Sequence, residues 1–200
     1  MAKTARPVDT FTVLVDTLPF NCSYELFCEG LVEATIGGRT WLNDRVERGK
    51  EKQGSTYAGL IFDPTDSLGG PIAAINLGGS DTSRLVNAAG KVDWMQLHPD
   101  VDFDQAFTKM PWLIGSGQFL YGHATTRCGF PAAGSGLSAK GDRRIMNVML
   151  EVLADTVRPG MVEAMTGLRD NGAKWLDGEP RPEYAEMADI CQGWQTVTVS

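Results

Sequence analysis

The residues with the clearest chemical potential lie in the stretch YGHATTRCGFPAAGSGLSAKGDRR, from Tyr121 to Arg144. His123 can take up and release a proton near neutral pH, and Cys128 carries a thiol that can act as a nucleophile. We therefore name His123 and Cys128 as candidate catalytic residues for hydrolase- or lyase-type acid–base chemistry. A hydrogen-bonded structural histidine and an inert buried thiol are the alternatives for these two positions.

The same stretch is suited to holding a small anion. Arginine binds carboxylate or phosphate through two parallel hydrogen bonds, and glycine lets backbone N–H groups approach a ligand closely. The candidate substrate-binding residues are Arg127, Gly134, Gly136, Lys140, Arg143 and Arg144. The spacing of GSGLSAKG matches neither the G-x-x-x-x-G-K-[ST] phosphate loop nor the G-x-G-x-x-G fingerprint, so the class of anion stays open.

A second, acidic stretch reads LHPDVDFDQAF, from Leu97 to Phe107. As a strand it would place one imidazole and three carboxylates on a single face, since strand side chains alternate. Such a face could bind a divalent metal ion, and the protein would then be a metal-dependent enzyme. Its metal ligands would be His98, Asp100, Asp102 and Asp104. The sequence favours another interpretation, in which HPD opens a turn and Asp102 or Asp104 caps a short helix. No metal or cofactor is therefore assigned.

The first half of the chain must supply the framework for these sites. DTFTVLVD (Asp9–Asp16) alternates and is β-branched, which predicts a strand. A helix is predicted to begin after Asn21 or Ser23 and to end at Gly37–Gly38. Two apolar runs, Tyr57–Phe62 and Ile72–Leu77, flank a turn-rich segment and predict a hairpin with a long tip.

The second half is predicted to alternate short elements. The segment SDTSRLVNAAG (residues 80–90) indicates a short helix that ends just before Gly90. The next segment, KVDWMQL (Lys91–Leu97), indicates a strand. The segment Gly117–Arg127 has β character, and the Gly- and Ala-rich Cys128–Gly141 is predicted to be a loop. Residues 121–144 as a whole are expected to roof the ligand pocket.

The longest predicted helix begins at Asp142 as its N-cap, carries apolar residues at helical spacing and is interrupted by Pro159. A short helix (residues 181–193) and a strand (194–200) close the chain. Together these elements predict an α+β fold with a mostly antiparallel sheet, one long late helix and several short helices. We expect a single globular domain over residues 1–200.

Composition narrows the classes of partner. The formal net charge of -7 argues against nucleic acid and anionic membrane surfaces, both of which need surplus Lys and Arg. No apolar run reaches the roughly 20 residues that span a bilayer, so a cytoplasmic location is expected. The four cysteines are scattered without a C-x-x-C, which favours free thiols.

The sequence thus predicts a small soluble enzyme or ligand-binding protein whose partner is a small anionic molecule, a carboxylate or a phosphate. One alternative is a non-catalytic structural or interaction protein that forms a homo-oligomer. The other is the divalent-metal enzyme built on the acidic stretch.

Overall fold

Within the part of the chain that the structure describes, five strands form one sheet in the order β1-β3-β2-β5-β4. The computed structural model describes residues 8–66, 69–79, 82–115 and 123–172. The strands are β1 (Thr10–Val13), β2 (Tyr57–Phe62), β3 (Pro71–Leu77), β4 (Thr125–Arg127) and β5 (Phe130–Ser135). Each of the four strand pairings described is antiparallel, which confirms the predicted type of sheet.

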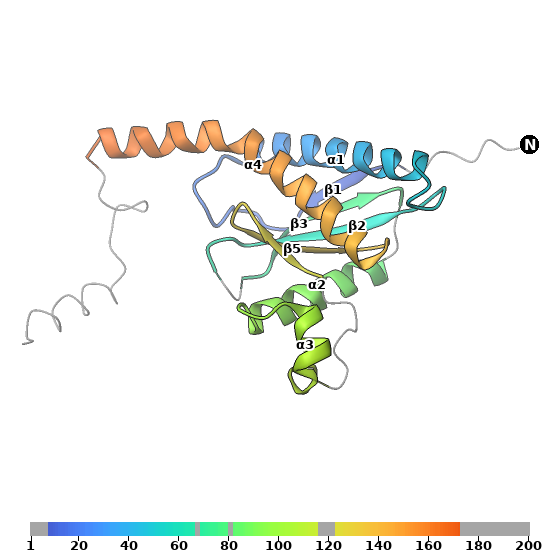
Figure 1. Cartoon of the computed structure of the whole chain (residues 1–200). Coiled ribbons are helices and arrows are strands. Elements are labelled where there is room, and N and C mark those ends of the chain that lie inside the picture. The colour runs from blue at the N-terminus through green and yellow to red at the C-terminus, as the bar shows by residue number, and fades with distance from the viewer. Residues whose placement is uncertain (1–7, 67–68, 80–81, 116–122, 173–200) are drawn as a thin grey trace, which may run out of the picture. The chain divides into compact units, whose positions relative to one another are not determined.

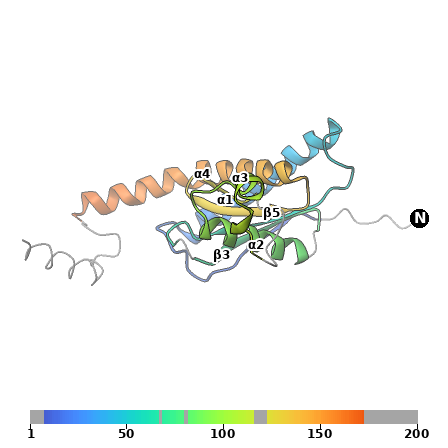
Figure 2. The same cartoon turned by 60° about the horizontal axis from the view of Figure 1, so that its bottom comes forward.

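The helices cover both faces of this sheet. They are α1 (Tyr24–Glu47), α2 (Thr82–Leu97), α3 (Phe103–Lys109) and α4 (Ala139–Asp170), with a 3-10 turn at Pro111–Leu113. The part of α4 before Gly160 lies with α1 on one face, and α2 lies on the other (Figures 1 and 2). The α+β class with one long late helix is confirmed. In the described part of the chain, none of the helices is long and apolar enough to cross a membrane.

The two faces follow from strand alternation. Leu60 and Phe62 of β2 pack with Ala88 and Val92 of α2 in one apolar cluster. Gly59, the residue before Leu60, faces the opposite side, where a Cβ would meet the methyl group of Met146 in α4 at 2.4 Å. Burying alternate apolar residues against separate helical layers is what stabilises a two-sided sheet.

The chain divides into two units, Met1–Gly160 and Met161–Ser200, and the sheet and its sites belong to the first. The expected single domain over residues 1–200 stays a prediction. The final helix and strand expected over residues 181–200 lie outside the described residues, as does the segment 117–122 of the expected β region. Cys22, Cys28 and Cys128 are free thiols, as predicted.

Helix α1 begins as predicted but does not end at Gly37–Gly38. Ser23 is the N-cap, and its hydroxyl accepts a hydrogen bond from the backbone N–H of Leu26. The two glycines lie inside the helix, where a Cβ at Gly38 would stand 2.6 Å from Sδ of Met149 in α4. They are glycines because two helices cross closely there, not because the helix stops.

Helix α2 corrects the prediction of a short helix followed by a strand. Residues 82–97 form one helix through Gly90. Leu85, Ala88, Val92 and Met95 recur at helical spacing and pack against the sheet. An isolated glycine lowers helix stability by about 1 kcal/mol, which this packed face offsets.

The predicted loop Cys128–Gly141 is also wrong. Phe130–Ser135 is strand β5, which pairs with both β2 and β4 inside the sheet. Helix α4 begins at Ala139 rather than after Asp142, and it continues through Pro159 instead of breaking there. The Ala- and Gly-rich composition of β5 is typical of a loop, which is why the strand was not predicted. The residues are small because Tyr57 and α4 occupy the space on that face of the strand.

Candidate functional site

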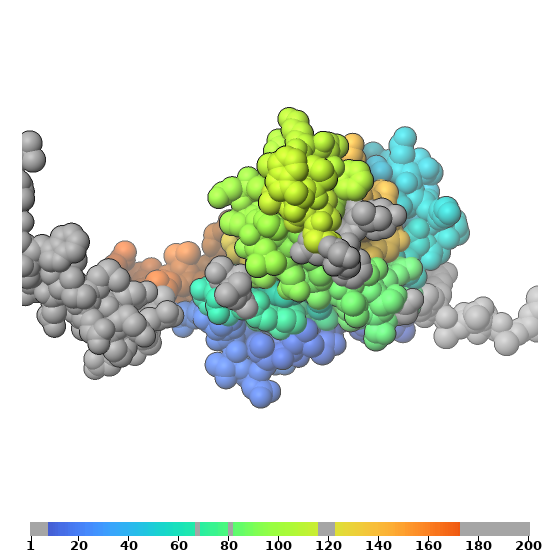
Figure 3. Space-filling view, turned by 90° about the horizontal axis from the view of Figure 1, so that it is seen from below, coloured from blue at the N-terminus to red at the C-terminus, as the bar shows by residue number. Residues whose placement is uncertain are grey.

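A cavity of about 640 Å³ opens beside the edge strand β4. Its walls come from the last turn of α2, the α2–α3 connection, the start of α3, both strands of the β4–β5 hairpin, and α4. The lining residues are Trp94, Met95, Gln96, Pro99, Asp100, Val101, Asp102, Phe103, Ala124, Thr125, Thr126, Pro131 and Arg143. Volumes of this size are typical of small-molecule sites. Figure 3 shows α3 standing out from the α2 surface on this side of the protein.

The α2–α3 connection is held by local hydrogen bonds. The N–H of His98 bonds to the carbonyl of Trp94, 3.1 Å away, and the N–H of Val101 bonds to the carbonyl of His98, also at 3.1 Å. Asp102 is the N-cap of α3, and its Oδ1 accepts from the N–H of Asp104 at 2.9 Å. The predicted cap is therefore confirmed, and the acidic stretch does not form a strand face.

Aromatic packing makes the inner wall rigid. The rings of Trp94 and Phe103 meet edge to face with centroids 5.0 Å apart, and the ring of His98 lies 4.8 Å from that of Trp94. Trp94 is 4% exposed, and Val101 and Ile114 pack against the same small cluster. This wall holds its shape without a ligand, because edge-to-face aromatic pairs add to the apolar burial.

Two buried N–H groups of cavity residues lack a partner. Nε1 of Trp94 and Nε2 of Gln96 are shielded from solvent, and neither has a hydrogen bond within the described residues. A buried donor without an acceptor costs about 1–3 kcal/mol. Both nitrogens are closed off from solvent, so an acceptor bound in the cavity reaches them only after side chains of the lining have shifted.

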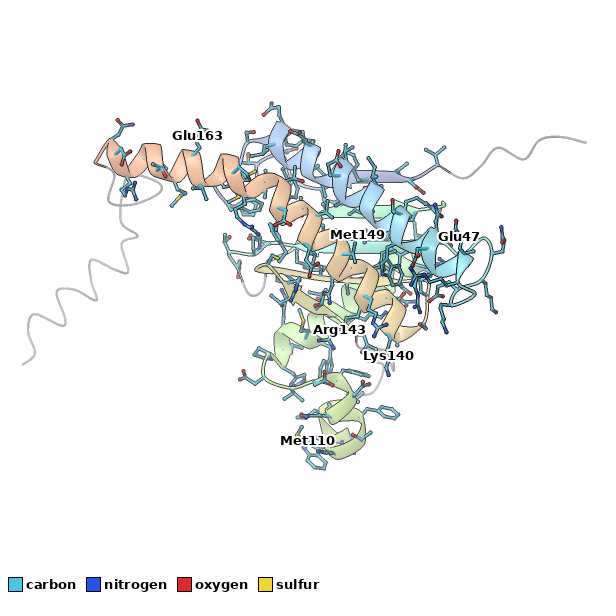
Figure 4. All side chains as sticks on the ribbon, turned by 45° about the horizontal axis from the view of Figure 1, so that its top comes forward. Glu47, Met110, Lys140, Arg143, Met149 and Glu163 are labelled. Atoms are coloured by element: carbon cyan, nitrogen blue, oxygen red, sulfur yellow. The ribbon has the colours of Figure 1, made fainter. Side chains whose placement is uncertain are left out.

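Charged groups lie around the same cavity. The guanidinium of Arg143 is 3.7 Å from Oδ2 of Asp102, with side chains 47% and 48% exposed. Asp100 is an exposed carboxylate of the lining. A long ion pair between half-exposed side chains is weak, so Arg143 can turn to an incoming anion at little cost. Arg143 lies at the N-terminal end of α4 (Figure 4).

Arg143 is the member of the predicted anion-binding set that lines this cavity. Arg127 instead pairs with Glu151, its Nε 2.8 Å from Oε1. Lys140 and Arg144 are exposed on α4. These three cations are therefore not brought together with Arg143 around one ligand, as the sequence interpretation required.

The two predicted glycines serve the sheet instead of a ligand. Gly134 pairs with Gly59 across the β2–β5 ladder, and a Cβ on Gly134 would lie 1.8 Å from the hydroxyl of Tyr57. Gly136 has φ +139°, and its Cβ would lie 2.2 Å from the carbonyl oxygen of Thr56. Both positions lack a side chain because neighbouring protein atoms occupy the space.

His123 and Cys128 have different surroundings. Nε2 of His123 is 3.5 Å from Oδ1 of Asp104, and its ring centroid is 6.3 Å from that of Phe103. Cys128 is exposed at the hairpin tip, where its φ of 53° and the φ of 89° at Gly129 fit a type I′ turn. The geometry therefore gives no support to a catalytic pair, and the catalytic roles stay predictions.

The metal interpretation gains no support either. In the ranges that the structure describes, no three His, Cys, Asp or Glu side chains come together as a set able to hold a metal ion. Asp102 is used as a helix cap and His98 stacks on Trp94.

A second polar cluster is fully inside the protein and was missed by sequence reasoning. Nζ of Lys91 lies 2.9 Å from Oδ2 of Asp142 and 2.6 Å from the carbonyl of Gly134. Oδ1 of Asp142 accepts from the N–H of Leu137 at 2.8 Å. Burial raises the pKa of Asp142 despite the nearby Lys91, and burial also raises the pKa of Tyr57 well above its ordinary range. Because the ammonium of Lys91 and both carboxylate oxygens of Asp142 bond within the chain, we interpret this cluster as structural.

The cavity residues of α2 were also missed, because Lys91–Leu97 was predicted as a strand. The signal that could have found them is the spacing of Leu85, Ala88, Val92 and Met95, which is helical and continues through Gly90. Had that helix been recognised, Trp94 and Gln96 would have been placed in its last turn, next to the acidic stretch.

Comparison of the chain with known protein families found no match, and no curated protein or solved structure matched it either. The function is therefore inferred from the geometry of this chain.

Proposed function

We propose that the protein binds a small organic carboxylate in the cavity beside β4. The observation that carries this proposal is a lining that combines the guanidinium of Arg143 with Trp94 and Gln96, two residues whose buried N–H groups lack an acceptor among the described residues. The fork of N–H donors on the guanidinium, with two further N–H groups behind the wall, suits an acceptor with several lone pairs, which a carboxylate provides.

The charges of the lining favour a carboxylate over a phosphate. Asp100 and Asp102 line the same cavity as Arg143, so a doubly charged anion meets more repulsion than a singly charged one. The apolar part of the lining comes from Met95, Val101 and Phe103, among others. A ligand with a carboxylate head and an apolar or aromatic body matches this division of the walls.

The proposed function is binding rather than hydrolase- or lyase-type chemistry. His123, the candidate acid–base residue, has its Nε2 3.5 Å from Oδ1 of Asp104, and it is not among the described residues that line the cavity. General acid–base catalysis needs the proton-transferring group within hydrogen-bond reach of the ligand.

The test is calorimetric titration of the full chain with benzoate, 3-phenylpropionate and L-phenylalanine, three carboxylates that differ in their apolar bodies and in the presence of an ammonium group. We expect saturable binding of at least one. Arg143→Gln should weaken it about tenfold or more, since charge-assisted hydrogen bonds are worth about 1.5–3 kcal/mol.

Arg144→Gln is the matched control, because Arg144 is the adjacent residue of α4, is exposed, and does not line the cavity. Its affinity should stay within twofold of the parent chain. The proposal is overturned if none of the three probes binds saturably, or if Arg143→Gln binds them as well as Arg144→Gln does.

A further inference from the structure

We propose that the ligand of this cavity is a zwitterion, an amino carboxylate with an apolar side chain, whose ammonium group is bound by Asp100. This inference rests on the proposed function, since the same cavity and the same Arg143 hold the carboxylate. It adds the second charged group of the ligand and assigns the residue that recognises it.

The first argument is the net charge of the walls. Among the described residues, the lining contains one cation, Arg143, and two carboxylates, Asp100 and Asp102. A ligand that carries only a carboxylate would leave the occupied cavity with two uncompensated negative charges. A zwitterion brings no net charge and offers a partner to both signs.

The second argument is the difference between the two aspartates. Asp102 is already engaged, with Oδ1 capping α3 and Oδ2 facing Arg143. Asp100 has neither a hydrogen bond nor an ion pair with any described residue, and its side chain is exposed at the cavity wall. It is therefore the carboxylate available to an ammonium group that enters with the ligand.

The third argument is spacing. Asp100 is two residues from Asp102, so their Cα atoms are at most about 7 Å apart. Oδ2 of Asp102 lies 3.7 Å from the guanidinium of Arg143. Arg143 and the backbone of Asp100 thus both lie close to Asp102, a spacing compatible with an ammonium and a carboxylate carried on the same or on nearby carbon atoms.

The rest of the lining accounts for the ligand's side chain. Met95 and Val101 supply flexible and branched apolar surface, and Trp94 and Phe103 supply aromatic surface. Their rings are packed against each other and do not need to rearrange. An aromatic or long aliphatic side chain would gain most from this wall.

The experiment compares three probes of one shape by calorimetry on the full chain at pH 7. L-phenylalanine carries both charges, 3-phenylpropionate carries only the carboxylate, and 2-phenylethylamine carries only the ammonium. We expect L-phenylalanine to bind at least tenfold more tightly than either of the others. In Asp100→Asn the advantage of L-phenylalanine over 3-phenylpropionate should shrink to twofold or less.

The control variant is Asp93→Asn, which removes an exposed carboxylate of α2 outside the lining and should leave the ratio unchanged. If 3-phenylpropionate binds as tightly as L-phenylalanine and Asp100→Asn does not alter their ratio, the zwitterion inference fails while the proposed carboxylate site stands. If no probe binds, or if 2-phenylethylamine binds best and Arg143→Gln has no effect, both fail.

Discussion

Lys91 and Asp142 form a buried ion pair that joins the two helical layers at one end of the sheet. Their side chains are 3% and 5% exposed, and Nζ lies 2.9 Å from Oδ2. Lys91 belongs to α2 on one face, and Asp142 belongs to the first turn of α4 on the other. The pair meets where β5 ends, and the carbonyl of Gly134 accepts a further hydrogen bond from Lys91.

Replacing Lys91 by methionine leaves the carboxylate of Asp142 buried without its cation. We expect the free energy of unfolding to fall by about 3–5 kcal/mol, measured by urea denaturation at pH 7.5. The pKa of Asp142 is raised by burial, so stability from this group is present at low pH and is lost as pH rises through the folded-state pKa. The deficit of Lys91→Met should therefore be smaller at pH 4.5.

The double variant Lys91→Met with Asp142→Asn is the control for this pair. Asparagine keeps an acceptor for the N–H of Leu137 but carries no charge. It should recover at least half of the lost stability. A single variant that costs less than 1 kcal/mol would contradict the assignment of a stabilising buried pair.

Gly134→Ala should destabilise the sheet. Its new Cβ would stand 1.8 Å from the hydroxyl and 2.1 Å from the ring of Tyr57, whose side chain is fully buried and cannot move away freely. We expect a loss of about 1–3 kcal/mol in urea unfolding. Gly70→Ala, where a Cβ meets open space, should change stability by less than about 0.5 kcal/mol. Equal effects of the two changes would contradict the close packing.

Asp9 makes the fold sensitive to acid. Its Oδ2 lies 2.7 Å from Nε of Arg39 and its Oδ1 lies 2.9 Å from the N–H of Gly78, which together hold the pKa of Asp9 below its ordinary value. The stability from this lowered pKa is present above the unfolded-state pKa and is lost as pH falls through the folded-state value. Asp9→Asn should cost about 1–2 kcal/mol at pH 7 after allowing for partial exposure.

The measurement for Asp9 is urea unfolding between pH 3 and pH 7. Asp9→Asn should show a flatter loss of stability towards pH 3 than the parent chain does. Asp93→Asn, at an exposed position of α2, serves for comparison and should keep the parent slope. An unchanged slope in Asp9→Asn would show that the pairing with Arg39 does not govern this pH range.

Cys128→Asn should stabilise the β4–β5 hairpin. Cys128 has a φ of 53°, a region that asparagine adopts more readily, and Asn-Gly is the preferred pair of a type I′ turn. We expect thermal unfolding to report a gain of about 0.5–1 kcal/mol. Ligand binding in the β4 cavity should not change, and a loss of binding would restore a functional role for this thiol.

Gln96→Met tests the unpartnered donor directly. The substitution keeps the length of the side chain but removes Nε2, which is buried without an acceptor. Without ligand, stability should be unchanged or higher by about 1 kcal/mol, whereas binding of L-phenylalanine should weaken about fivefold. Gln105→Met on the exposed surface of α3 should change neither. A destabilised ligand-free protein would mean that Nε2 has a partner.

Sequence patterns predicted a helix or strand correctly where the interactions that form it involve residues close together in the chain. The apolar runs of β2 and β3 predicted their hairpin, and Ser23 and Asp102 predicted helix starts, because a cap is closed by hydrogen bonds a few residues along the chain. Of the predicted anion-binding residues, Arg143 lines the β4 cavity, and its role in binding a ligand stays a prediction.

Sequence patterns that are compatible with two different structures gave wrong predictions. Gly37–Gly38 can end a helix or let another helix approach, and the side chains of Val152 and Met149 in α4 are what select the second meaning. The small residues of β5 are typical of a loop, but they are equally suited to a strand packed under a large side chain. The side chain of Tyr57 next to Gly134 is what requires small residues in this strand. From the sequence, Lys91 is expected at the surface. In the folded chain it is buried, because Asp142 of α4 supplies an opposite charge.

Composition, apolar periodicity and capping residues were thus enough to establish the α+β class, the β2–β3 hairpin and the long late helix, since these depend on interactions close in the chain. The cavity could not be foreseen in the same way. Trp94, Asp100 and Arg143 come from three separate segments, and packing of those segments around the β4 edge is what brings their side chains to one place. Burial and charge pairing between residues that are far apart in the sequence depend on how the whole chain folds.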